Sequence, residues 1–346
     1  MEPAQFFTAS RVAIVAGKGG VGKTTVSAAL ARAAALSGLA TLIVEVEGKS
    51  GLAAMFGKEP LAYDEIVLSG GGGGADGGND PRAAEVKART LTPDDALLEY
   101  LQDHGMSRLS KRLMSSGALD VVSTAVPGIK DILVLGKVKQ IERAASSGAP
   151  GAPDFVVLDA PAAGHAIRFL QSARGLVDAV KVGPINTQAS EVLELLTDPA
   201  RCQVLLVTLA EETPVNELVE TAFSLEDKVG VSLGPVVVNG LYPEVDGLDV
   251  DPAAAAEAAG TGLRKGEAED LAAAARFRRD RMALQREQLA RLADQLPLPQ
   301  LRLPYLFNAD LGPADIDGLA AVLLEGIEAL PDPTPVPADA GQGGAG

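Results

Sequence analysis

The sequence predicts an α/β fold in which a mainly parallel sheet carries helices on both faces. Short apolar runs rich in β-branched residues alternate along the 346-residue chain with Ala- and Leu-rich segments of helical period. Most of these runs are continuously apolar, as expected for strands that helices cover on both sides. The chain is 47% hydrophobic, enough for one large core or two smaller ones. The expected strands are residues 11–16, 41–46, 155–158, 203–209, 235–238 and 298–303.

The spacing of these strands predicts an insertion. About a hundred residues separate the second expected strand from the third, far more than one crossover needs. We therefore expect an inserted helical subdomain at residues 61–149, between the two parts of a core at residues 1–60 and 150–330. The Gly-rich stretch 70–78 and the Pro- and Gly-rich tail 331–346 cannot bury enough surface to offset their chain entropy. We expect the first to be a flexible loop and the second to be disordered.

Charge and cysteine content exclude several classes of function. Acidic residues outnumber basic ones by 46 to 30, which gives a net charge of −16. This charge disfavours nucleic acid and anionic membranes as partners. The single cysteine, Cys202, excludes an intrachain disulfide and is expected to be a small buried residue in a reducing compartment. The sequence shows no signal-peptide pattern and no apolar run of about 18 residues, so we expect a cytoplasmic protein without a direct membrane anchor.

The most specific motif follows the first expected strand directly. Residues 17–25 read Gly-Lys-Gly-Gly-Val-Gly-Lys-Thr-Thr and lead into an Ala-rich helical segment at 26–36. This is a P-loop, G-x-x-x-x-G-K-[ST], whose backbone N–H groups form a cradle for phosphates at a helix N-terminus. Lys23 is predicted to reach the β- and γ-phosphates of ATP, and the Thr24 hydroxyl to ligate Mg²⁺. The predicted nucleotide contacts are Gly19, Gly20, Val21, Gly22, Lys23, Thr24 and Thr25.

A second lysine stands one residue into this loop. Taken alone, Lys18 would be an ordinary solvated charge. Residues 18–25, however, resemble the deviant Walker A motif K-G-G-V-G-K-T-T of the ParA/MinD/ArsA group of ATPases. In that group the first lysine reaches across a dimer interface to the partner's nucleotide. The resemblance implies that Lys18 stabilises transition-state charge in a second subunit.

Residues 155–170 resemble one branch of this group. They read Phe-Val-Val-Leu-Asp-Ala-Pro-Ala-Ala-Gly-His-Ala-Ile-Arg-Phe-Leu, similar to the switch II segment D-T-A-P-T-G-H-T-L-R-F-L of the ArsA/GET ATPases. The resemblance implies that Asp159 holds Mg²⁺ through water, and that Gly164 and His165 belong to a segment that responds to the γ-phosphate. Ala163 replaces the family's threonine, so one switch hydroxyl is missing.

Further residues resemble this family's pattern. Glu47 stands where many relatives have the aspartate that orients the attacking water; it keeps the carboxylate but lengthens it by one methylene. Glu211 matches a glutamate of the family's subunit interface and joins the predicted switch residues. The resemblance implies that Asn239 reads the adenine through its amide and that Pro304 and Tyr305 border the base. Taken alone, Tyr305 could also be a core residue.

The sequence thus predicts a Mg²⁺-dependent ATPase of the ArsA/GET type. ATP would close two subunits and hydrolysis would reopen them, coupled through the helical insert to a protein client or membrane partner. A homodimer and a heterodimer with a related ATPase subunit both fit. No zinc is expected, because no Cys-x-x-Cys motif is present.

Two other hypotheses remain open. One is an ATP-binding switch or pseudoenzyme subunit with weak hydrolysis, suggested by Glu47 and Ala163. The other is a ParA/MinD-type positioning ATPase, which the acidic composition disfavours because it offers no evident surface for DNA.

One locally basic segment has no role in this scheme. A long helix is predicted at about residues 263–296, and within it Arg276–Arg281 contains four arginines in an otherwise acidic chain. We favour a solvated helix face as its explanation. The alternatives are a wall near the nucleotide phosphates or a contact with a partner.

Overall fold

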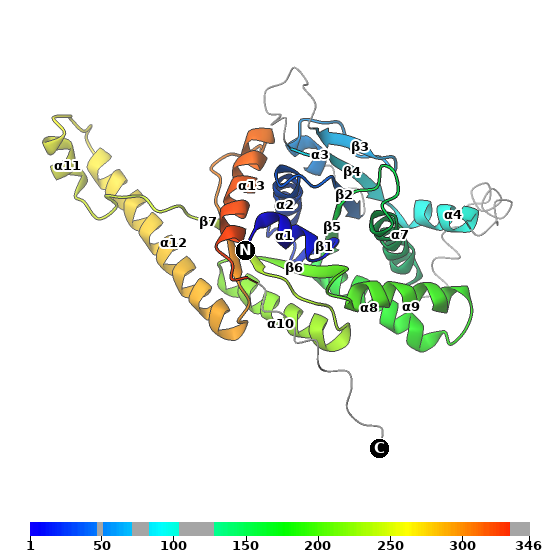
Figure 1. The fold of residues 1–346 in the computed structure, drawn as a ribbon. Helices are drawn as coiled ribbons and strands as arrows, with labels where there is room; N and C mark the ends of the chain where they lie inside the picture. Colours follow the sequence, from blue (N-terminus) through cyan, green and yellow to red (C-terminus); the bar gives the residue numbers. More distant parts are fainter. Residues whose placement is uncertain (47–50, 71–82, 104–127, 333–346) are drawn as a thin grey trace.

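The computed structural model describes residues 1–46, 51–70, 83–103 and 128–332. Its core is one eight-stranded sheet, built from β1 (Val12–Gly17), β2 (Thr41–Val46), β3 (Ile66–Ser69), β4 (Val86–Leu91), β5 (Phe155–Ala162), β6 (Cys202–Leu209), β7 (Val236–Leu241) and β8 (Gln300–Pro304). The strand order is β3-β4-β2-β5-β1-β6-β7-β8 (Figure 1). Every neighbouring pair is parallel except β3 and β4. The predicted α/β fold with a mainly parallel sheet is therefore confirmed.

Helices cover both faces of this sheet (Figure 1). Alternate residues of β1 enter different cores: Ile14 packs into the cluster on one face and Val15 into the cluster on the other. Because both faces are covered, every residue of β1 and β2 is buried. One face carries α1 (Pro3–Thr8), α2 (Lys23–Leu36), α3 (Gly51–Met55) and α13 (Pro313–Glu328); the other carries α7 (Ile129–Ser146), α8 (Ala163–Ala179), α9 (Pro184–Thr197) and α10 (Glu212–Lys228).

Residues 61–149 depart from the helical insert that the sequence predicts. β4 pairs in parallel with β2 along its whole length, and β3 adds an antiparallel edge. The prediction is wrong for these two strands. β4 escaped detection because charged residues interrupt its apolar run, Val-Lys-Ala-Arg-Thr-Leu. One of these charges, Arg89, is buried, with its guanidinium 4.3 Å from the ring centroid of Tyr63.

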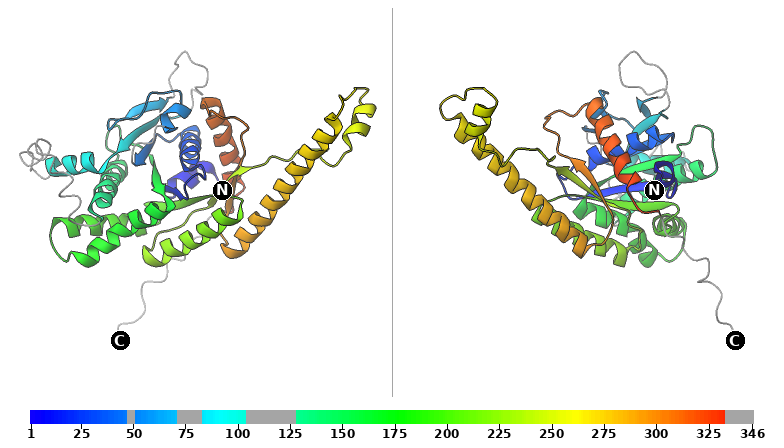
Figure 2. Two further views of the ribbon diagram at one scale, coloured as in Figure 1. Left: turned by 180° about the vertical axis from the view of Figure 1, so that it is seen from behind. Right: turned by 60° about the vertical axis from the view of Figure 1, so that its left-hand side comes forward.

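Two helices begin at or near the residues where the sequence signals place them. α4 (Pro93–Asp103) is capped by Thr92, whose hydroxyl accepts a hydrogen bond from the Asp95 N–H at 3.2 Å. The predicted long helix is α12 (Glu267–Gln295), preceded by the short α11 (Pro252–Ala258). Both views of Figure 2 show α11 and the first part of α12 standing away from the sheet.

Some expectations fall outside the described residues. Residues 71–78 of the Gly-rich stretch predicted at 70–78 are not among the described residues, and neither are residues 333–346 of the predicted tail. Across the described ranges, none of the helices combines the length and the hydropathy that a membrane crossing requires.

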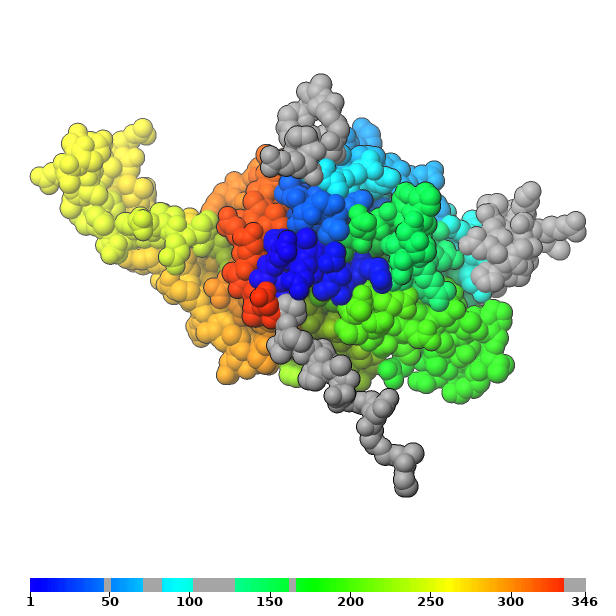
Figure 3. Space-filling view, viewed as in Figure 1, coloured from blue at the N-terminus to red at the C-terminus, as the bar shows by residue number. Residues whose placement is uncertain are grey.

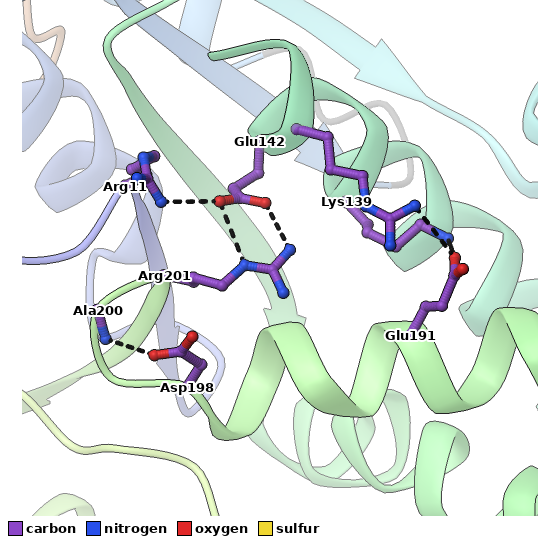
Figure 4. A network of polar contacts seen from close by, with 8 residues as sticks. Arg11, Lys139, Glu142, Glu191, Asp198, Ala200 and Arg201 are labelled. Carbon is purple, nitrogen blue, oxygen red and sulfur yellow. Dashed lines mark hydrogen bonds and ion pairs between the residues drawn. The ribbon is translucent and has the colours of Figure 1, made fainter. Parts of the chain in front are cut away.

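Ion pairs tie helix α7 to the amino ends of the central strands and to helix α9 (Figure 4). The Glu142 carboxylate of α7 is 1% exposed and lies 3.1 Å from Arg11 and 2.6 Å from Arg201, which precede β1 and β6. The hydrogen bond to Glu142 raises the pKa of Arg201. Nearby, Glu191 of α9 pairs with Lys139. Two half-buried guanidinium groups therefore share one buried carboxylate.

Replacing this carboxylate should destabilise the fold. Glu142→Gln keeps the side-chain volume but leaves Arg11 and Arg201 facing each other, so we expect a loss of about 3 kcal/mol in the free energy of unfolding in urea. The matched control is Glu85→Gln, which removes a partly exposed pair with Lys87 and should cost less than about 1 kcal/mol. Equal losses for the two variants would contradict a structural role for the Glu142 pairs.

Candidate functional site

The P-loop connects the end of β1 to the start of α2. Gly17 lies so close to β6 that a Cβ there would overlap the Val207 carbonyl oxygen. Gly20 and Gly22 have φ values of 86° and 89°, in the left-handed region that favours glycine. The loop then enters α2 at Lys23. The strand, the glycine turn and the helix N-terminus thus have the arrangement that the predicted phosphate cradle requires, while phosphate binding itself stays a prediction.

The predicted metal-binding residues meet beside this loop. The Thr24 hydroxyl of α2 donates a hydrogen bond of 2.7 Å to Oδ2 of Asp159 on β5. Asp159 is buried, and the sheet register places it next to Val15 of β1. Two residues that are 135 positions apart in the sequence are therefore in direct contact.

Lys23 lies over the loop. Its side chain is buried, and its ammonium donates to the carbonyl oxygen of Lys18 at 3.1 Å. This contact holds the Lys23 ammonium beside the backbone turn where phosphates are predicted to bind.

The second lysine of the motif turns outward. The Lys18 ammonium forms an ion pair with Glu217 of α10 and is 53% exposed. In a single chain Lys18 is thus held by a carboxylate of its own subunit.

The strand next to Asp159 contributes a carboxylate that the sequence analysis did not select. Glu45 of β2 lies directly beside Asp159 in the sheet register and is buried, and one of its carboxylate oxygens accepts from Thr90 at 3.2 Å. Its position at the carboxyl end of a central strand, where α/β sheets bind ligands, could have marked Glu45 as a candidate site residue from the sequence. Glu47 lies outside the described residues, so its assigned role stays a prediction.

Asn239 of β7 contacts the P-loop from the other side. Its amide nitrogen donates to the Val21 carbonyl oxygen at 2.9 Å, and a Cβ at Gly22 would overlap that nitrogen. The structure therefore brings Asn239 to the loop, while its predicted hydrogen bonds to adenine stay a prediction.

An aromatic cluster made of Tyr242, Tyr305 and Phe307 follows β7 and β8. Tyr305 comes directly after Pro304, and its ring stacks on Tyr242 with a centroid distance of 5.3 Å. Phe307 meets Tyr305 edge-on at 4.8 Å. Tyr305 is 44% exposed, so it is not a core residue. The sequence analysis missed Tyr242 and Phe307, although each lies within three residues of a selected position.

The remaining predicted residues lie along the same edge of the sheet. Glu211 precedes α10 and accepts a hydrogen bond from Arg281 of α12 at 2.8 Å, which raises the pKa of Arg281. Gly164 and His165 lie in the first turn of α8, directly after β5; their side chains are outside the described part of the structure. Within the described ranges, no group of three or more His, Cys, Asp or Glu residues is arranged to hold a metal ion.

Comparison with known proteins finds a matching family model and relatives that are all named as ATPases. Residues 10–183 match the family model described as anion-transporting ATPase. The chain is 31% identical to the ATPase BagA of Mycobacterium tuberculosis over 321 residues, which cover 87% of this chain and 89% of BagA. It is 27% identical to the arsenical pump-driving ATPase of Escherichia coli over 255 residues, 69% of this chain and 41% of that protein. It is also 27% identical to the ATPase GET3 of Zygosaccharomyces rouxii over 218 residues, 62% of this chain and 58% of that protein.

Two glycines of the P-loop provide a test of its packing. Gly20 and Gly22 have similar positive φ angles, but only Gly22 faces the Asn239 amide nitrogen. Gly20→Ala should therefore cost about 1–2 kcal/mol for its backbone conformation alone. Gly22→Ala should cost more, since Asn239 must also move away, and urea unfolding of the two variants measures the difference. Equal destabilisation would mean that Asn239 does not rest on the loop.

Proposed function

The chain belongs to the ArsA family of anion-transporting ATPases, and we propose that its ATPase cycle requires Mg²⁺ and closes two subunits around the nucleotide. The contact between Thr24 and Asp159 is the observation that carries this proposal. It joins the P-loop, which binds phosphates, to the strand that supplies a carboxylate. Residues 18–25 and 155–170, which carry the family resemblance, contribute these two side chains.

The residues at this contact fit Mg²⁺. The ion prefers oxygen ligands, keeps several waters, and is commonly bound through one or two carboxylates together with substrate phosphates. A hydroxyl and a buried carboxylate, 2.7 Å apart at the start of α2, match that preference. When bound, Mg²⁺ neutralises charge on the β- and γ-phosphates. Thr24 would be a direct ligand, and Asp159 would hold an ion-bound water.

Two lysines would neutralise the phosphate charge that Mg²⁺ leaves. Lys23 is held beside the loop and would contact the phosphates of its own subunit. Lys18 is exposed and would reach the nucleotide of a second subunit, either another copy of this chain or a related ATPase. In that case Lys18 must first leave Glu217, so subunit closure and release of this ion pair are coupled.

The aromatic cluster supports a position for the base. Nucleobases stack on exposed aromatic rings. The half-exposed Tyr305 and the Asn239 amide both lie at the carboxyl edge of the sheet, and the Asn239 amide contacts the P-loop. We assign the adenine to this region, bordered by Pro304.

A protein client would use the described helices α4 and α7, next to the sheet edge formed by β4 and β3.

Turnover of Mg²⁺-ATP by the purified chain tests this function. Lys23→Ala should lose nucleotide binding. Lys18→Ala should bind ATP like the wild type but turn over about 10²–10³-fold more slowly, because one charge donor to the transition state is lost. A wild type that binds ATP without measurable turnover would contradict the hydrolysis cycle and favour the ATP-binding switch suggested by Glu47 and Ala163.

A mixing experiment tests whether Lys18 acts on the second subunit. Asp159→Asn and Lys18→Ala should each be inactive alone. In a mixed dimer, the Lys18→Ala subunit keeps its own Asp159 and receives Lys18 from its partner. An equal mixture should recover about a quarter of the wild-type rate, since half of the randomly formed dimers are mixed and each has one complete site. No recovery would mean that Lys18 acts within its own chain.

Glu217 should restrain turnover by holding Lys18. Glu217→Gln removes the charge that pairs with Lys18, and partly exposed pairs of this kind contribute about 0.2–1 kcal/mol. We therefore expect the ATPase rate at limiting protein concentration to rise by a factor of about two to five. The matched control is Glu220→Gln, an exposed position one turn further along α10, which should leave the rate unchanged. A slower Glu217→Gln enzyme would show that this carboxylate assists the reaction.

A further inference from the structure

Helix α12 is an arm that only partly belongs to the body of the protein. Its 29 residues extend over about 43 Å, at 1.5 Å per residue. Its second half is attached to the body through side chains of Arg281, Gln285 and Arg291. Its first half packs against α11 and projects with it, as the yellow segment of Figure 3 shows.

The two sides of α12 differ in their surroundings. The side turned to the body carries Arg278, whose guanidinium is 5.5 Å from the Phe307 ring centroid, and Gln285, which bonds to Gly240 and Tyr242. The opposite side faces solvent. We name it the outer face of α12: this half of the helix carries the exposed residues Arg276, Phe277, Arg279, Leu284 and Arg286 together with the acidic Asp280 and Glu287.

The composition of the outer face does not match a solvated helix. Phe277 is 61% exposed, and Leu284, two turns further along, is also exposed. Arg276 and Arg279 are three residues apart, a spacing at which like charges destabilise a helix. Arginine and aromatic side chains are, in contrast, enriched in the parts of protein interfaces that contribute most to binding. The outer face thus has the character of an interface.

The charge of the outer face of α12 indicates which kind of protein surface would bind it. Of the arginines in α12, Arg276, Arg279 and Arg286 lie on the outer face together with Asp280 and Glu287, a net charge of +1, whereas the chain outside α12 contains 24 lysines and arginines against 40 aspartates and glutamates. The body of a second copy of this chain is acidic, so its charge is opposite in sign to that of the outer face of α12. Nucleic acid fits less well, because the acidic body would repel it and an exposed Phe277 would add nothing to phosphate contacts.

The position of α12 agrees with this choice of partner. Its inner side bonds to Gly240 and Tyr242 at the carboxyl end of β7 and to Glu211 after β6. The same edge of the sheet carries the P-loop, which Asn239 contacts. A second subunit that delivers Lys18 to this edge would lie next to α12.

We propose that the outer face of α12 docks onto the acidic body of a second copy of this chain and clasps the dimer. The inference rests on the proposed function, because it assumes that two subunits are required. The new point is the surface that holds the two subunits together, which lies away from the residues that would contact nucleotide. Salt should weaken the clasp, because its attraction is partly between exposed charges.

Sedimentation velocity with Mg²⁺-ATP tests the clasp. Phe277→Ser and the double variant Arg276→Glu/Arg279→Glu should each raise the dimer dissociation constant at least about tenfold, as expected for central interface residues. The matched control is Arg264→Glu/Lys265→Glu, an equal charge change on exposed residues between α11 and α12, which should leave the constant unchanged. Binding of a fluorescent ATP analogue to the monomer should be the same in all variants.

Cross-linking identifies the surface that is contacted. Cys202 is buried, and burial raises the pKa of its thiol to about 12, so an added cysteine can be labelled selectively. Arg279→Cys carrying a benzophenone photocrosslinker is mixed with ¹⁵N-labelled wild type. Mass spectrometry should find cross-links between a light and a heavy copy, in an acidic region of the second copy.

Several results would overturn the inference. They are a wild type that binds ATP but stays monomeric, outer-face variants that dimerise like the wild type, cross-links confined to one copy, or a shift of duplex DNA that Phe277→Ser abolishes. A wild type that binds no ATP but forms a dimer sensitive to Phe277→Ser would support the clasp while refuting the proposed nucleotide cycle. The two proposals can therefore fail separately.

Discussion

The hydrogen bond between the Thr24 hydroxyl and the Asp159 carboxylate is the contact around which the site is organised. It exists because β1 and β5 are parallel neighbours in fixed register, so the loop after β1 and the end of β5 meet at one edge of the sheet. A shift by one residue would turn Asp159 to the other face. The buried apolar residues on both faces hold that register, and core packing thereby brings the Thr24 and Asp159 side chains together beside the P-loop.

The two edges of the sheet have different polar arrangements. At the amino edge, Glu142 is enclosed by Arg11 and Arg201, a closed network that joins helices to strands (Figure 4). At the carboxyl edge, polar groups face one another across a loop of positive-φ glycines, and part of the edge is exposed. This difference agrees with the proposed cycle, in which nucleotide would bind at the carboxyl edge and a second subunit would close over it.

Three features point away from the single chain. Lys18 is 53% exposed and pairs with Glu217 on the surface of its own subunit, the aromatic cluster is half open to solvent, and α12 presents arginines and a phenylalanine outward. Each is accounted for if a second copy covers the carboxyl edge. The inner side of α12 touches Glu211 and the aromatic cluster, so the same helix would connect the nucleotide site with the subunit contact.

The sequence by itself determined the fold class, the P-loop and the long helix α12, because these depend on local order: apolar runs, glycine spacing and helix-capping signals. The family resemblance of residues 155–170 selected Asp159, and its predicted metal-binding role together with Thr24 stays a prediction. Tertiary structure alone decided the rest. β4 joins the sheet despite its charges because Tyr63 covers Arg89, and Glu45 lies beside Asp159 because β2 and β5 are neighbours. The aromatic cluster and the two sides of α12 likewise depend on which elements meet in space. Such contacts join residues far apart in the chain, and no pattern within a single segment records them.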